Sequence, residues 1–156
     1  MAGIIKPVVK RLISFASLTL RAMTLGVRAA VIDDQDRIIL VKHSYLPGWY
    51  LPGGGVDPGE TIFQAMRREL HEETNVAVDE VPDPFGIYLN RTLSRRDHVA
   101  FFVIRNFDQP APPKLPNAEI IDCQWFALTD LPDDTTPGTL RRIAEIKAGR
   151  RQNDEW

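Results

Sequence analysis

Residues 53–76 read GGGVDPGETIFQAMRRELHEETNV, and this stretch decides both the fold and the kind of site to expect. Its first half is rich in glycine and carries a proline, which predicts a loop of fixed shape. From Thr61 to Thr74 the apolar residues recur at helical spacing, which predicts a helix with one side in the core. Glu69, Glu72 and Glu73 fall within two turns of that helix. The stretch therefore predicts a glycine-rich loop followed by a helix with clustered acids.

The three glutamates are expected to share one side of the helix. Each residue advances about 100° around a helix, so Glu73 lies about 40° to one side of Glu69, and Glu72 about 60° to the other. Like charges at such spacing repel by a few tenths of a kcal/mol per pair. Clustered carboxylates are typical ligands of Mg²⁺, which also takes phosphate oxygens of a substrate. A solvated acidic face is the alternative, and the shaped loop ahead of the helix favours the metal site.

Strands are predicted on both sides of this loop and helix. Residues 24–33 and 37–44 are rich in β-branched side chains and flank a predicted hairpin turn. Further strands are predicted at 85–91, 97–107 and 119–128, the first two paired with each other. A second helix is expected from about Thr136, with Pro137 in its first turn. This order predicts an α+β fold, or an α/β/α sandwich around a mixed β-sheet.

Composition places the chain among ordinary globular proteins. Its 156 residues are 44% hydrophobic and 26% charged, with a formal net charge of −2. The centre of the chain has no basic stripe, so no nucleic-acid partner is expected. Cys123 is the single cysteine, which excludes an intrachain disulfide and predicts a cytoplasmic protein. We expect one main domain over residues 24–150 and a C-terminal tail over residues 151–156.

The first 23 residues are expected to form a basic amphipathic arm or helix. Residues 1–28 contain five basic side chains and no acidic one, with apolar residues at helical spacing. Three interpretations stay open: an arm docked on the domain or on the partner in a homodimer, a helix in peripheral contact with anionic membrane lipid, or a cleaved targeting segment. No run of residues is long enough to span a bilayer.

The loop and helix resemble the Nudix box, G-x5-E-x7-R-E-U-x-E-E-x-G-U, where U is aliphatic. Its positions are matched by Gly54, Glu60, Arg68, Glu69, Leu70, Glu72, Glu73 and Val76. Asn75 stands in place of the last glycine. That position ends the helix in a left-handed conformation, which Asn tolerates next best after glycine. The resemblance covers most of residues 24–142 and implies a Nudix-like α/β/α sandwich with an intact metal site.

The resemblance implies a pyrophosphohydrolase that depends on Mg²⁺, with Mn²⁺ as a substitute. Its substrate would be a small molecule, a nucleoside diphosphate linked to another moiety, cleaved at a phosphoanhydride bond. The expected metal ligands are Gly53 through its carbonyl, Glu69, Glu72 and Glu73. The expected catalytic residues are Glu69, Arg68 and Glu72. A Nudix-type module that binds a nucleotide without turnover is the alternative, disfavoured because every carboxylate of the box is present.

Two roles stay open within this scheme. The general base is either Glu69 or a later acid such as Asp97 or Glu119. Glu60 either binds the metal through water or caps the start of the helix.

The residues that select the substrate are expected outside the box. Candidate substrate-binding residues are Arg28, His43, Tyr88 and Arg91, with Tyr45 and His98 as further members of a cleft over the sheet. The alternative for each is structural, because aromatic residues fill cores and most Arg and His side chains are solvated. The identity of the substrate stays open.

Overall fold

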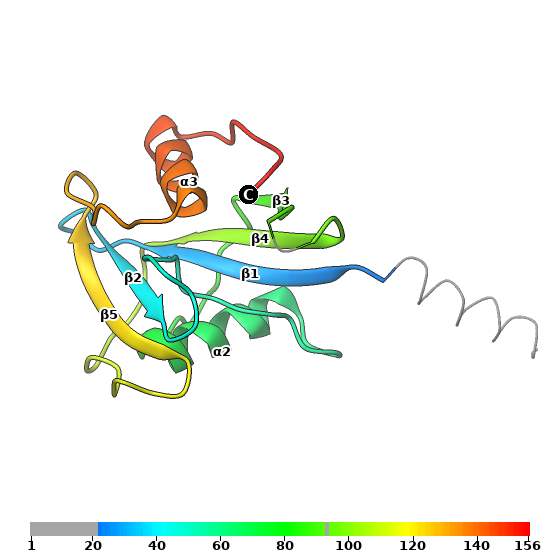
Figure 1. Ribbon diagram of the computed structural model, residues 1–156. Helices are drawn as coiled ribbons and strands as arrows, with labels where there is room; N and C mark the ends of the chain where they lie inside the picture. Colours follow the sequence, from blue (N-terminus) through cyan, green and yellow to red (C-terminus); the bar gives the residue numbers. More distant parts are fainter. Residues whose placement is uncertain (1–21, 93) are drawn as a thin grey trace, which may run out of the picture.

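The computed structural model describes residues 22–92 and 94–156 of the chain (Figure 1). The arm predicted at residues 1–23 lies outside the described residues, except for its last two. The described elements are β1 (Thr24–Val31), β2 (Arg37–His43), α2 (Ile62–Thr74), β3 (Gly86–Leu89), β4 (Asp97–Ile104), β5 (Ile120–Ala127) and α3 (Pro137–Ala148). Both predicted helices and all five predicted strands are confirmed. Within the described residues, no helix is long and apolar enough to cross a membrane.

The strands form a three-stranded sheet and a two-stranded sheet. In the first, β1 pairs in parallel with β4, and β3 pairs antiparallel with the other edge of β4. In the second, β2 pairs antiparallel with β5. The three-stranded sheet is therefore mixed, which confirms the predicted α+β character.

The predicted turn between β1 and β2 forms, but the two strands do not continue as a hairpin. They share one isolated bridge, between Ile32 and Ile38. The glycine-rich loop occupies the free edge of β1 instead, because Val27 N donates to Gly54 O (2.8 Å) and Ala29 N donates to Pro52 O (3.0 Å). This pairing attaches the loop to the edge of β1, next to helix α2.

The two helices cover opposite sides of the sheets (Figure 1). On one side, Val27, Ala29 and Val31 of β1 belong to the same buried cluster as Met66 and Leu70 of α2. Ala30 and Ile32, which alternate with them along the strand, belong to a second cluster with Ile143 of α3. Alternation along β1 thus supplies both cores, and the arrangement is an α/β/α sandwich.

The C-terminal residues pair with the outer edge of β3. Leu89 N donates to Asp154 O (2.9 Å), and Trp156 N donates to Leu89 O (3.0 Å). The ring of Trp156 packs edge-on against Tyr88 and Phe101, with centroids 5.9 and 5.8 Å away. Residues 154–156 are therefore packed on the sheet and contribute to the core.

A buried ion pair lies under this C-terminal segment. Arg142 and Glu145 of α3 are 0% and 1% exposed, and Arg142 Nε lies 3.2 Å from Glu145 Oε2. The guanidinium is centred 3.8 Å from the ring of Tyr88. Glu145 accepts hydrogen bonds from the Tyr88 hydroxyl (2.8 Å), Gln152 N (2.8 Å) and Asn153 N (2.9 Å). The carboxylate is therefore well supplied with donors.

Candidate functional site

Helix α2 begins and ends through local side-chain contacts. Thr61 is the N-cap: its hydroxyl accepts from Gln64 N (3.2 Å), and its N–H donates to Gln64 Oε1 (2.9 Å). This capping box satisfies two N–H groups at the helix start, so Glu60 is not the cap. At the other end Asn75 adopts φ 55° and ψ 24°, the left-handed conformation predicted for it. Both ends hold the acidic residues of the helix in a fixed place.

Arg68 organises the acidic cluster. Its guanidinium binds both oxygens of Glu60, with Nε 3.0 Å from Oε1 and Nη2 2.9 Å from Oε2. The same group donates to Glu69 Oε1 (2.6 Å) and to the carbonyl of Gly55 (3.0 Å), and it lies 3.4 Å from Glu72 Oε2. The hydrogen bonds from Arg68 hold the pKa of Glu60 below its ordinary value. One arginine therefore ties the loop to three glutamates.

Glu69 and Glu73 are the buried members of the cluster. They are 8% and 4% exposed, and Glu73 Oε2 accepts from Gly53 N at 2.7 Å. Burial raises the pKa of Glu73 to about 7, against the opposing effects of the Arg28 charge and the Gly53 N–H. Burial also raises the pKa of Glu69, against the hydrogen bond from Arg68. Such shifts arise where burial disfavours the charged form of a carboxylate, and a bound cation would favour that form.

Two glycines allow the loop to approach these carboxylates. A Cβ on Gly54 would lie 2.4 Å from Glu69 Oε1, so any side chain at this position would occupy the space beside the carboxylate. Gly53 has φ 136°, and a Cβ there would lie 2.1 Å from Val27 O. The carbonyl of Gly53, expected as a metal ligand, accepts a hydrogen bond from Arg28 Nη1 instead. The N–H of Gly53 is the group that faces the cluster.

The donors at this site fit a hard divalent cation. All are carboxylate oxygens on one side of α2, two of the carboxylates are buried, and Gly54 leaves room beside Glu69. Over residues 22–92 and 94–156, no three Asp, Glu, His or Cys side chains already converge as a ligand set. The Glu72 side chain is 58% exposed and turned towards Arg68.

The structure places two of the four candidate substrate-binding residues near this cluster. The positive charge of Arg28 acts on both Glu73 and His43, and His43 is 4% exposed at the end of β2. Burial, followed by the charge of Arg28, lowers the pKa of His43 to about 4. His43 is therefore neutral at ordinary pH.

The other two candidates are engaged in structural contacts elsewhere. Tyr88 is fully buried in the cluster that includes α3, and its hydroxyl donates to Glu145. Arg91 Nε lies 2.6 Å from Glu155 Oε1 in the C-terminal segment. The structure does not bring either side chain to the acidic cluster. No local pattern signals this, because the burial of Tyr88 depends on Trp156 and α3.

The two later acids considered as general bases have different surroundings. Asp97 is 4% exposed and accepts from Thr24 Oγ1 (2.6 Å) and Asn90 Nδ2 (2.8 Å). The contact with Asn90 spans the turn between β3 and β4, and the contact with Thr24 links β4 to the start of β1. Glu119 is exposed, and its charge helps to raise the pKa of Glu73. Of the two, Glu119 is the acid close to the cluster.

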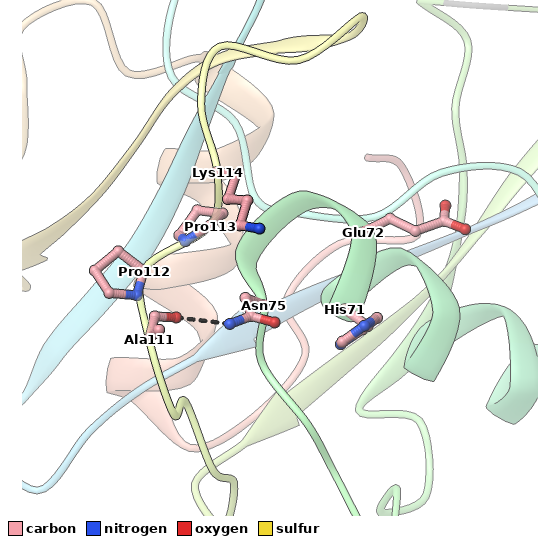
Figure 2. Close-up of a pocket in the computed structure, with 7 residues that line it drawn as sticks. All are labelled: His71, Glu72, Asn75, Ala111, Pro112, Pro113 and Lys114. Carbon is pink, nitrogen blue, oxygen red and sulfur yellow. Dashed lines mark hydrogen bonds between the residues drawn. The ribbon is translucent and has the colours of Figure 1, made fainter.

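A groove runs beside Glu72 at the end of α2 (Figure 2). Its volume is about 370 Å³, and its lining residues are His71, Glu72, Asn75, Ala111, Pro112, Pro113 and Lys114. The proline-rich loop is tied to the helix end because Asn75 Nδ2 donates to Ala111 O (2.8 Å) and Gln109 Nε2 to Thr74 O (2.8 Å). The groove therefore lies between the end of α2 and the proline-rich loop, which the sequence indicated only as a loop.

Comparison with known proteins identifies the family of this chain. Residues 23–145 match the NUDIX domain. The chain is 32% identical over 128 residues to a putative 8-oxo-dGTP diphosphatase from Bacillus subtilis. The aligned region covers 81% of each protein. It is 36% identical over 107 residues to an RNA pyrophosphohydrolase from Rhodopseudomonas palustris, over 57% of this chain and 64% of that protein.

The fold has solved counterparts as well. A crystal structure of a MutT Nudix hydrolase from Burkholderia pseudomallei matches with a TM-score of 0.66 and 26% sequence identity, over 79% of this chain and 97% of that one. The match of most of the chain to the domain, with relatives named as diphosphatases and pyrophosphohydrolases, establishes the assignment. The chain belongs to the Nudix family and is a Nudix hydrolase.

Proposed function

We propose that this chain is a Mg²⁺-dependent pyrophosphohydrolase of nucleoside diphosphate derivatives, with nucleoside triphosphates as its first substrate class. The observation that carries the proposal is the pair of buried carboxylates, Glu69 and Glu73, held on one side of α2 next to a glycine-rich loop. Burial raises the pKa of both carboxylates, so a bound cation would favour their charged forms. A divalent cation there would neutralise the phosphate chain and activate water.

The protein residues divide into ligands and positioning groups. Glu69, Glu72 and Glu73 are proposed to hold the cation. Arg68 is proposed to orient Glu69 through its 2.6 Å contact, and Gly53 to orient Glu73 through its N–H. These contacts fix both buried carboxylates before a substrate arrives, so little reorganisation is needed at the moment of reaction.

Glu119 is the proposed general base. Glu69 is a poor choice because Arg68 already binds its carboxylate. Glu119 is exposed and acts electrostatically on Glu73, so it has free oxygens near the cluster. In this role its carboxylate would accept the proton from the attacking water.

The choice of nucleoside triphosphates rests on the relatives. The B. subtilis relative is named for 8-oxo-dGTP and the R. palustris relative for RNA pyrophosphate. Both names refer to a phosphoanhydride on a nucleotide. Oxidised and unmodified guanine nucleotides are therefore the substrates to test first.

The test is hydrolysis of dGTP, 8-oxo-dGTP, a 5′-triphosphorylated oligoribonucleotide and ADP-ribose, with Mg²⁺, Mn²⁺ or EDTA. Phosphate and pyrophosphate release reports on the triphosphates, and a coupled phosphatase releases phosphate from the AMP and ribose 5-phosphate that cleavage of ADP-ribose would form. We expect hydrolysis of a triphosphate that EDTA abolishes. Glu69→Gln should lower kcat by at least about two orders of magnitude, whereas Glu80→Gln, at an exposed acid beyond the helix, should leave it unchanged. Silence with both metals on all four compounds would overturn the proposal.

A further inference from the structure

We propose that Tyr45 and His43 form the nucleobase-binding surface of this enzyme, Tyr45 by stacking on the base and His43 by hydrogen bonding to its edge. The inference rests on the proposed function and adds which part of a nucleotide these residues recognise. It depends on two observations: a buried histidine without hydrogen-bond partners, and an exposed aromatic side chain beside the acidic cluster.

His43 is buried, yet its polar atoms are unpaired. Its side chain is 4% exposed, and neither Nδ1 nor Nε2 has a hydrogen-bond partner among the described residues. Leaving buried polar atoms unpaired costs free energy, so such atoms are expected to gain a partner in another state of the protein. A neutral imidazole offers one donor and one acceptor, which is the pattern that the edge of a nucleobase can meet.

Tyr45 covers this histidine while it remains exposed itself. The two ring centroids lie 5.3 Å apart with a 42° tilt, and Tyr45 is 63% exposed. The next residue, Leu46, is also an exposed apolar side chain, at 42%. A large ring held so loosely can rotate away from His43 and present its face to a ligand.

Tyr45 lies beside Glu119, because Ser44, the residue before it, donates its N–H to Glu119 O (2.8 Å). The charges of Glu119, Glu73 and Glu69 add to burial in raising the pKa of the Tyr45 hydroxyl, which agrees with this placement. A nucleotide whose phosphates lie on the glutamates is thus proposed to extend its base towards Tyr45. Aromatic side chains bind bases by stacking without requiring a particular sequence or phosphate.

Arg28 supports the neutral form of His43. Its Nη1 donates to Leu51 O at 3.2 Å and to Gly53 O, which fixes this nitrogen on backbone carbonyls. Its positive charge disfavours protonation of His43 and so preserves the donor and acceptor of the neutral ring.

The test measures how much the base contributes to binding beyond the sugar phosphate. Binding of GMP, AMP, CMP and UMP, and of ribose 5-phosphate as a base-free probe, is measured by calorimetry with Mg²⁺. Wild-type protein should bind one nucleotide at least about tenfold tighter than ribose 5-phosphate. Tyr45→Ala should weaken that nucleotide about tenfold or more without changing ribose 5-phosphate binding or the melting temperature. Tyr45→Phe should recover most of the affinity, and Ile87→Ala, an exposed control on β3, should bind like wild type.

His43→Phe distinguishes recognition from packing. Phenylalanine keeps a ring against Tyr45 and Tyr50 and removes both unpaired nitrogens, so the melting temperature should stay equal or rise. The preference among the four bases should shrink about tenfold. A purely structural histidine would give the same melting temperature with unchanged binding.

The inference and the proposed function fail in different ways. Hydrolysis of a triphosphate with no effect of Tyr45→Ala or His43→Phe on nucleotide binding would overturn the inference alone. Wild-type protein that binds no nucleotide more tightly than ribose 5-phosphate would also overturn it. The opposite case is a protein that hydrolyses none of the four compounds but binds one nucleotide through its base, with that binding lost in Tyr45→Ala. This result would overturn the proposed function and support the inference.

Discussion

Replacing Glu145 by glutamine should destabilise the fold more than replacing its partner Arg142 by methionine. The two side chains form a fully buried ion pair, but their hydrogen bonds are unequal. Glu145 accepts from three donors besides Arg142. Arg142 has one hydrogen bond, from Nη1 to Glu155 O (3.2 Å), and among the described residues Nε and Nη2 have none. The carboxylate can stay satisfied alone, whereas the guanidinium cannot.

The expected magnitudes follow from this asymmetry. Glu145→Gln leaves a buried cation without a counter-charge, which costs about 3–5 kcal/mol, a large part of the roughly 5–15 kcal/mol of a typical domain. Arg142→Met loses the ion pair with Glu145, one hydrogen bond and the contact over Tyr88. Three donors still stabilise the charge of the Glu145 carboxylate, and the two N–H groups without hydrogen bonds among the described residues are removed. The cost of this variant is expected at about 1–2 kcal/mol. The double variant should be more stable than Glu145→Gln alone.

Urea unfolding followed by tryptophan fluorescence measures these differences. With a slope of about 2 kcal/mol/M, Glu145→Gln should lower the midpoint by about 1.5–2.5 M. An Arg142→Met variant as unstable as Glu145→Gln, or a Glu145→Gln variant within about 1 kcal/mol of wild type, would refute the reasoning. Glu80→Gln provides a control on an exposed acid.

The remaining predictions concern pH, the glycine loop and the thiol. Burial raises the pKa of Glu145, but hydrogen bonds led by Gln152 N outweigh it and leave the pKa below its ordinary value of 4.5. A lowered folded pKa adds stability above the unfolded value, so the difference between wild type and Glu145→Gln in urea should shrink as pH falls below about 4.5. Gly54→Ala places a methyl group against Glu69 and should lower metal-dependent kcat more than tenfold with circular dichroism unchanged; full activity would contradict the close approach. Partial burial raises the pKa of Cys123 to about 12, so DTNB at pH 8 should react with it slowly in the native protein and rapidly in urea; equal rates in the two conditions would contradict the raised pKa.

The local features of the site could be predicted from the sequence. Helix α2, its acidic side and the left-handed end at Asn75 depend on residues within a few positions of each other. The contacts of Arg68 with Glu69 and Glu72 follow from the same helical spacing. For these features, periodicity and capping rules were sufficient.

The contacts between distant segments could not be predicted in this way. The free edge of β1 pairs with the loop at Pro52 and Gly54, so β2 pairs with β5 instead. The peptide of Gly53 is oriented with its N–H towards Glu73 and its carbonyl towards Arg28, and the role of that carbonyl as a metal ligand stays a prediction. Such orientations depend on the packed sheet, and a sequence pattern carries no signal for them.

Arg68 binds Glu60, the carbonyl of Gly55 and Glu69 at the same time. These contacts also constrain the number of residues between Gly55 and Glu60. The loop must span a fixed distance while Gly54 stays on the edge of β1 and Glu60 stays on the guanidinium. One residue inserted or deleted between 55 and 60 would detach one of these anchors, and the acidic cluster would lose its shape. The exposed residues Glu80 and Asp83, between α2 and β3, have no such anchor among the described contacts. Among related sequences, insertions and deletions should therefore be frequent between α2 and β3 and rare in the glycine-rich loop before α2.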